Sequence, residues 1–137
     1  MSWDIFKLVF PRTFAGHTSR VYESQITFDE DFMIVCPNGI KAKCMVMALL
    51  GTIEMTWPAK QLTFIKQARF SPRGQYPHGC HLIVYIGPDT FMVEMDTHGE
   101  EQTPLLGDTI NHTETWKVVD KVLDRQNPDQ ITELMHI

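Results

Sequence analysis

Apolar residues recur at every second position along most of the chain, which is typical of β-strands with one buried face. Residues 52–57 show the pattern most clearly, since Ile53, Met55 and Trp57 fall on one side. Similar runs occupy residues 3–10, 25–28, 32–36, 62–70, 81–86 and 91–95. Residues 40–50 alternate like a strand but contain helix-favouring Ala, Lys, Met and Leu; we favour the strand. The pattern predicts a mainly β (α+β) fold of about seven short strands.

Only one segment shows a convincing helical period. The apolar face of this helix would consist of four residues, Trp116, Val119, Val122 and Leu123. We expect this C-terminal amphipathic helix to begin after Thr113, a good N-cap, and to end before Pro128. Residues 97–112, which lie between the last strand hairpin and this helix, show no period and are predicted to form a long loop.

Length and composition fit one globular domain over residues 1–137, with a tail at 128–137 that is flexible or adds a short helical turn. Apolar residues make up 43% of the chain and charged residues 21%, and this composition excludes a chain that is disordered as a whole, a collagen-like fibre and a coiled coil. Residues 1–10 contain Asp4 and Lys7 and therefore lack the apolar stretch of a secretory signal. Three cysteines without CxxC spacing also favour a reducing, cytoplasmic location.

This order of elements resembles the PH-like fold of GRAM and small bacterial PH domains. The resemblance rests on the hairpin at 26–36, residues 55–58 leading into 62–70, the hairpin at 82–95 and the closing helix at 116–125. It implies a strongly bent antiparallel sheet or roll closed at one end by that helix. It also implies binding of anionic lipid headgroups by basic residues around an open end of the sheet.

The net charge of −5 is distributed unevenly. Residues 89–137 contain eleven acids and only three basic residues. Within the long loop, acids surround two leucines that would form an apolar anchor, and these candidate partner-binding residues are Glu100, Glu101, Leu105, Leu106 and Asp108. Protein interfaces use an apolar centre for affinity and charges for steering. Alternatively, the two leucines fold back onto the core and the acids merely solvate the loop.

The middle of the chain has the opposite charge, since residues 32–88 contain one acid and six basic residues. The basic residues form an alternative anion-binding set: Lys41, Lys43, Lys60, Lys66, Arg69 and Arg73. Aromatic residues lie among them, as single-stranded nucleic acid binding requires. The overall negative charge disfavours nucleic acid, so an anionic membrane headgroup is the better candidate for this set.

Reactive side chains are densest at residues 78–81. Candidates for a metal site are His78, Cys80 and His98, and Cys80 with a histidine base is a candidate for nucleophilic catalysis. The spacing fits no familiar zinc knuckle, and Cys80 enters a strand, whereas reactive cysteines sit in electropositive positions such as helix N-termini. We therefore expect no cofactor and no metal.

With no catalytic motif in the sequence, we expect a non-catalytic intracellular binding protein rather than an enzyme. The first hypothesis is a protein partner engaged through the acidic and apolar surface, as in toxin-neutralising immunity proteins or phage and viral antagonists of host machinery. The alternatives are a PH-like module that binds anionic lipid headgroups, and a small Cys/His enzyme. The sequence leaves the oligomeric state open.

Overall fold

The computed structural model describes residues 7–11, 14–19, 25–28, 32–48, 51–90, 92–122, 127 and 129–130. Strands dominate this part of the chain, and the only helical elements given bounds within it are three short 3-10 helices. The strands are β1 (Lys7–Pro11), β2 (Phe14–Ser19), β3 (Ile26–Phe28), β4 (Phe32–Val35), β5 (Ala42–Ala48), β6 (Thr52–Trp57), β7 (Leu62–Ala68), β8 (Leu82–Ile86), β9 (Val93–Thr97) and β10 (Glu114–Val119). The 3-10 helices are η3 (Pro58–Lys60), η4 (Pro77–Gly79) and η5 (Pro88–Thr90).

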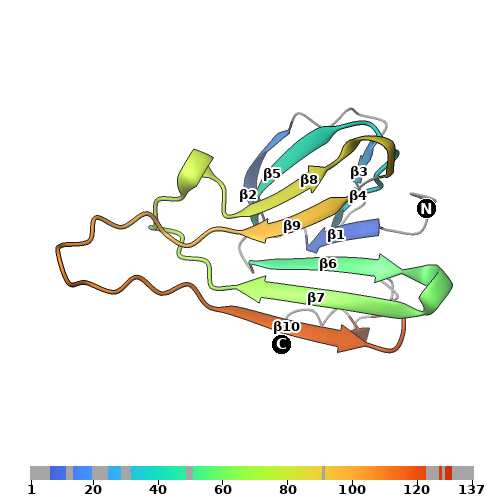
Figure 1. Cartoon of the computed structure of the whole chain (residues 1–137). Helices are drawn as coiled ribbons and strands as arrows, with labels where there is room; N and C mark the ends of the chain where they lie inside the picture. The colour runs from blue at the N-terminus through green and yellow to red at the C-terminus, as the bar shows by residue number, and fades with distance from the viewer. Residues whose placement is uncertain are drawn as a thin grey trace.

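The strands form two antiparallel sheets (Figure 1). The first has six strands in the order β10-β7-β6-β1-β4-β3, and the second has four in the order β2-β5-β8-β9. Consecutive hairpins build much of both sheets, because β3 pairs with β4, β6 with β7, and β8 with β9. The protein is therefore mainly β, as the two-residue period predicts.

The hydrophobic core lies between the two sheets. Val35 and Ile53 come from the six-stranded sheet, and residues of β5 and β8 come from the other. The second group consists of Ala42, Cys44, Leu82, Val84 and Ile86, with Val93 and Met95 of β9 packed against it. These positions alternate along each strand, so burying them removes one face of each sheet from water.

Most of the predicted strands are confirmed. The ambiguous segment 40–50 contains strand β5, and the run at 81–86 contains β8, which lies between β5 and β9 as its apolar character on both faces suggests. Pro58 begins the short helix η3 between β6 and β7, where a proline removes no ladder hydrogen bond. None of the helices in the described part of the chain has the length and apolar character needed to cross a bilayer.

The prediction of a C-terminal amphipathic helix is wrong. Residues 114–119 form strand β10, which pairs with β7 along its whole length, from Glu114 opposite Ala68 to Val119 opposite Thr63. The expected number of strands is also too low, since the described residues form ten. Part of the predicted helix, residues 123–126, lies outside the described residues. The same is true of most of the predicted tail, residues 128 and 131–137.

Candidate functional site

The long loop predicted between the last hairpin and the C-terminal element is present, and we call residues 98–113 the interaction loop. It joins β9 of the four-stranded sheet to β10 of the six-stranded sheet and extends beyond the ends of both (Figure 1). Every residue from 100 to 113 is exposed. The loop is therefore a projecting segment held at its two ends by different sheets.

The tip of the interaction loop is a defined turn. The backbone N–H of Asp108 donates to the carbonyl of Leu105 at 3.0 Å, and the Asp108 carboxylate accepts from the N–H of Leu105 at 2.8 Å. Gly107 has a φ of 95°, a left-handed conformation that glycine adopts at little cost. Asp108, predicted to contact a partner, thus also closes the turn that presents Leu105 and Leu106.

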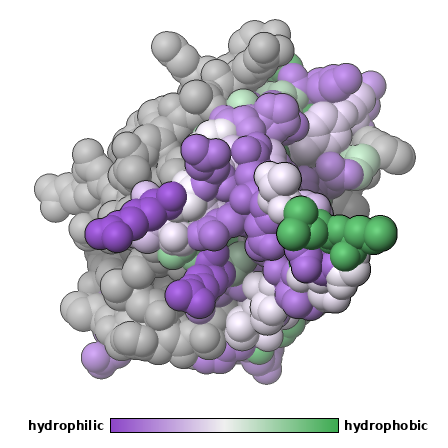
Figure 2. Space-filling view, turned by 90° about the vertical axis from the view of Figure 1, so that its left-hand side faces the viewer, coloured by the Kyte–Doolittle hydropathy of each residue, from purple (hydrophilic) through white to green (hydrophobic). Residues whose placement is uncertain are grey.

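The two leucines point into solvent. Leu105 is 77% exposed and Leu106 is fully exposed, and Ile110 behind them is 52% exposed. On the side of the molecule that carries this loop, Figure 2 shows one strongly hydrophobic group standing out from a mostly hydrophilic surface. The alternative in which these leucines fold back onto the core does not occur in the structure.

The base of the interaction loop is fastened to the preceding loop at residues 71–79. The N–H of Glu101 donates to the carbonyl of Gln75 at 2.7 Å. The Glu100 side chain lies against Gly74, where a Cβ atom would come within 2.5 Å of Glu100 Oε1. The five predicted residues therefore fall into two groups, with Leu105, Leu106 and Asp108 at the tip and the two glutamates at the base.

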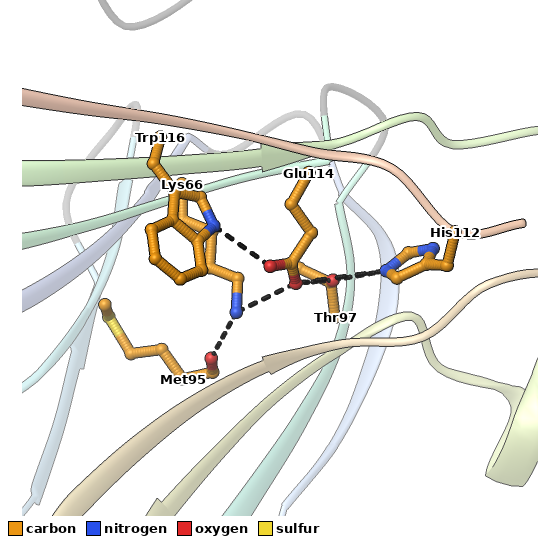
Figure 3. A network of polar contacts seen from close by, with 6 residues as sticks. All are labelled: Lys66, Met95, Thr97, His112, Glu114 and Trp116. Atoms are coloured by element: carbon orange, nitrogen blue, oxygen red, sulfur yellow. Dashed lines mark hydrogen bonds and ion pairs between the residues drawn. The ribbon is translucent and has the colours of Figure 1, made fainter.

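A polar network joins the end of the interaction loop to both sheets (Figure 3). At its centre the Lys66 ammonium of β7 lies 2.9 Å from Glu114 Oε1 of β10 and donates to the carbonyl of Met95 in β9, also at 2.9 Å. Only 11% of the Lys66 side chain and 21% of the Glu114 side chain are exposed. A largely buried ammonium needs such partners, because removing it from water without them would be very costly.

Glu114 accepts further hydrogen bonds, from the Thr97 hydroxyl and, at 2.9 Å, from the Trp116 indole. Because the single hydroxyl hydrogen of Thr97 goes to this carboxylate, the His112 Nε2 atom, 2.7 Å from the Thr97 oxygen, acts as a donor. Burial raises the pKa of Glu114, but these hydrogen bonds and the charge of Lys66 lower it by more. The pKa of this carboxyl therefore lies below its usual value, and Glu114 is ionised at neutral pH.

The sequence contains only a partial signal for this network. Lys66 is the one charge on an otherwise apolar alternating face, but its partners lie about thirty and fifty residues further along the chain. No local pattern connects those positions.

The residues of the alternative anion-binding set lie in different parts of the structure. Lys66 belongs to the network, Lys60 lies 5.7 Å from the ring centre of Trp57, and Arg73 is exposed in the loop at 71–79. Arg69 lines a polar cavity of about 410 Å³ at the base of the interaction loop. Lys41 and Lys43 line one cavity together, on the four-stranded sheet.

The candidate metal residues do not assemble a site. His78 is exposed in η4, Cys80 is buried, and the backbone N–H of His98 donates to the carbonyl of His81 at 2.7 Å. In the part of the chain that the structure describes, no group of three or more His, Cys, Asp or Glu side chains is placed to hold a metal ion. Two acids, Glu94 and Asp96, lie exposed on the outer face of β9.

Comparisons with known proteins identify no relative: no family model, no curated protein and no solved structure matches the chain significantly. The fold alone defines the class of this protein: it is mainly β, with two antiparallel sheets and a projecting loop between them.

Proposed function

We propose that this protein is a non-catalytic binding protein that captures a protein partner through the interaction loop. The observation that carries the proposal is the exposure of Leu105 and Leu106 on a hydrogen-bonded turn. Burying a leucine side chain contributes about 1.5–3 kcal/mol, so an exposed pair provides substantial binding energy once a partner covers it.

The anchoring of the loop supports the same proposal. Its tip is closed by Asp108, its base is bonded to Gln75, and its C-terminal end is held through the network at Glu114. A binding segment that is already ordered loses less conformational entropy when the partner docks. The arrangement suits a rigid protrusion that inserts into a groove.

The charge of the loop defines the chemistry of the partner. The sequence contains no lysine or arginine between Arg73 and Lys117, whereas Glu100, Glu101 and Asp108 lie in the loop itself. The complementary surface is an apolar groove rimmed by lysine and arginine, which the acidic loop would approach rapidly at low salt. Toxin-neutralising immunity proteins and phage or viral antagonists of host machinery include small acidic proteins of this kind.

Neither alternative function, the lipid-binding module or the Cys/His enzyme, is supported by an observation comparable to the two exposed leucines. A PH-like lipid module needs its basic residues around one open end of a sheet, and here they are dispersed and the closing helix is a strand. A Cys/His enzyme would need an accessible thiol, but Cys80 is buried. The cytoplasmic location belongs to this proposal and is supported by the lack of any disulfide among the three cysteines, all of which lie in the described residues.

Affinity capture from the native host followed by kinetic measurement tests the proposal. We expect Leu105→Ala with Leu106→Ala to weaken binding of the captured protein by about tenfold or more, mainly through faster dissociation. Glu100→Lys with Glu101→Lys should slow association and flatten its salt dependence. Val118→Ala is a matched control, because Val118 is similarly exposed but lies on β10. Equal binding by all variants would exclude the loop as the interface.

A further inference from the structure

A second candidate site lies on the face of the four-stranded sheet that points away from the core. A cavity of about 480 Å³ opens there, lined by Lys41, Ala42, Lys43, Met45, His78 and Tyr85. Strand β5 turns Ala42 and Cys44 inward, so the alternating residues Lys43 and Met45 face outward. The volume falls within the usual range for small-molecule sites.

The lining of the cavity includes two lysines that form no ion pair with a described side chain. These lysines, Lys41 and Lys43, lie two positions apart in the chain. His78 adds a further ring nitrogen from η4, where a φ of 59° places it in the left-handed region. An anion bound in the cavity would be attracted by both ammonium groups, and phosphate is an anion that lysines commonly bind in proteins.

The rest of the lining is apolar and aromatic. Tyr85 of β8 lies directly opposite Lys43 in the strand register, and Met45 lies opposite Ile83. Both Tyr85 and Met45 are half-buried, so each presents one side to the cavity. A phenol ring and a thioether beside paired cations fit a flat aromatic body attached to the anionic group.

One acid limits how the ligand can lie. Glu94 of β9 is opposite Tyr85 on its other side and is exposed on the same outer face. A negatively charged group would be repelled from that edge and attracted towards β5. The phosphate is therefore expected at the lysine end, with the aromatic body over Tyr85 and Met45.

We propose that this cavity binds a phosphate monoester carried on an aromatic body, of the nucleoside monophosphate type. Lys41 and Lys43 neutralise the phosphate, Tyr85 stacks with the ring, and His78 supplies a polar contact at the cavity edge. The site lies on different elements from the interaction loop and does not depend on the function proposed for that loop.

Isothermal titration calorimetry with adenosine monophosphate, with inorganic phosphate alone and with phosphoinositide-containing vesicles tests the proposal. We expect saturable binding of the nucleotide, weaker binding of inorganic phosphate, and loss of affinity at raised salt. Lys41→Gln with Lys43→Gln should weaken nucleotide binding about tenfold or more, and Tyr85→Leu should remove the preference over inorganic phosphate. Glu94→Gln should strengthen nucleotide binding.

Lys60→Gln is the matched control, because Lys60 is an exposed lysine on η3, outside the cavity lining. Thermal unfolding of each variant shows that it retains its fold. The proposal is overturned if the wild-type protein does not bind the nucleotide saturably, or if the control weakens binding as much as the double variant. Binding to vesicles without binding to the nucleotide would also overturn it, because the ligand would then be a membrane headgroup.

Discussion

Two titratable residues of the six-stranded sheet, Lys66 and Glu54, are buried and form hydrogen bonds there. Lys66 falls on the alternating face that the sequence predicts to be apolar, and its ammonium is stabilised by Glu114 and by the carbonyl of Met95. Glu54 is buried on the opposite face of the same sheet and accepts a hydrogen bond from the Thr56 hydroxyl at 2.8 Å. Removing one partner of the Lys66–Glu114 pair would leave a largely buried charge without its counterion.

We predict that Glu114→Gln lowers the free energy of unfolding by about 1.5–3 kcal/mol at neutral pH, the usual contribution of hydrogen bonds to a charged group. The pKa of Glu114 is lower in the folded protein than in the unfolded chain. Its contribution is therefore complete above the ordinary glutamate pKa and is lost as the pH falls through the lower folded pKa. Urea unfolding from neutral to acidic pH measures this dependence.

Glu101→Gln is the control for this prediction, since Glu101 is exposed and forms no ion pair with a described residue. We expect it to change stability little at any pH. A difference between wild type and Glu114→Gln that stays constant into the acidic range would contradict the assigned role of the Glu114 carboxylate.

Single residues on β7 also show that the sequence pattern can mislead about exposure. The apolar residues Leu62, Phe64 and Ala68 alternate along β7 with three others, Thr63, Ile65 and Gln67. By itself this alternation would place the second group towards water. Thr63 and Ile65 are instead completely buried, so both faces of the sheet are covered at this strand. In the sequence, the one indication that this outer face is covered is the apolar Ile65 on it.

At the scale of elements, the strand β10 is the main departure from the expected fold. The apolar spacing from Trp116 to Leu123 suits a helix, but Val118 and Val119 are β-branched and favour a strand. Strand β7 offers an unpaired edge along which β10 forms a complete antiparallel ladder, and the Thr63 hydroxyl donates to the carbonyl of Lys121 beyond it. Pairing with a distant strand outweighs the weak local preference for a helix.

We predict that Trp116→Ala lowers the free energy of unfolding by only about 1 kcal/mol, because Trp116 is 65% exposed on β10. Trp116 makes an edge-to-face contact with Phe64, at 5.8 Å between ring centres, and donates a hydrogen bond to Glu114. The Lys66 ammonium also lies over its ring, 5.7 Å from the ring centre. Chemical denaturation provides the measurement. Ile65→Ala, at a fully buried position of the neighbouring strand, should cost about 2–5 kcal/mol in the same experiment. A loss of 3 kcal/mol or more (roughly that of a buried aromatic residue) for Trp116→Ala would show that a further segment covers this ring.

At the scale of the whole molecule, the two sheets are held together by the core between them and by the network at Glu114. No disulfide joins the three cysteines, each of which lies in the described part of the chain. We therefore predict that dithiothreitol leaves the melting temperature unchanged, as measured by differential scanning calorimetry with and without the reductant. A large decrease in the melting temperature would contradict this prediction.

Local pattern was sufficient to predict most of the strands, the hairpins and the long loop. Alternation along residues 52–57 or 81–86 reflects the geometry of a single strand, and turn residues such as those at 37–39 reflect local backbone preferences. The candidate residues Leu105 and Leu106 were also identified locally, from two leucines among acids in a segment without a period.

Only the tertiary structure decided which face of each strand is covered, which strand pairs with β7, and whether the two leucines lie in the core or in solvent. Each of these depends on contacts between residues far apart in the chain, such as Lys66 with Glu114 or Thr63 with Lys121. The period of a sequence specifies how side chains are distributed around one element. The burial of that element is determined by the segments that fold against it, because the free energy of pairing and packing exceeds the local preferences of a few residues.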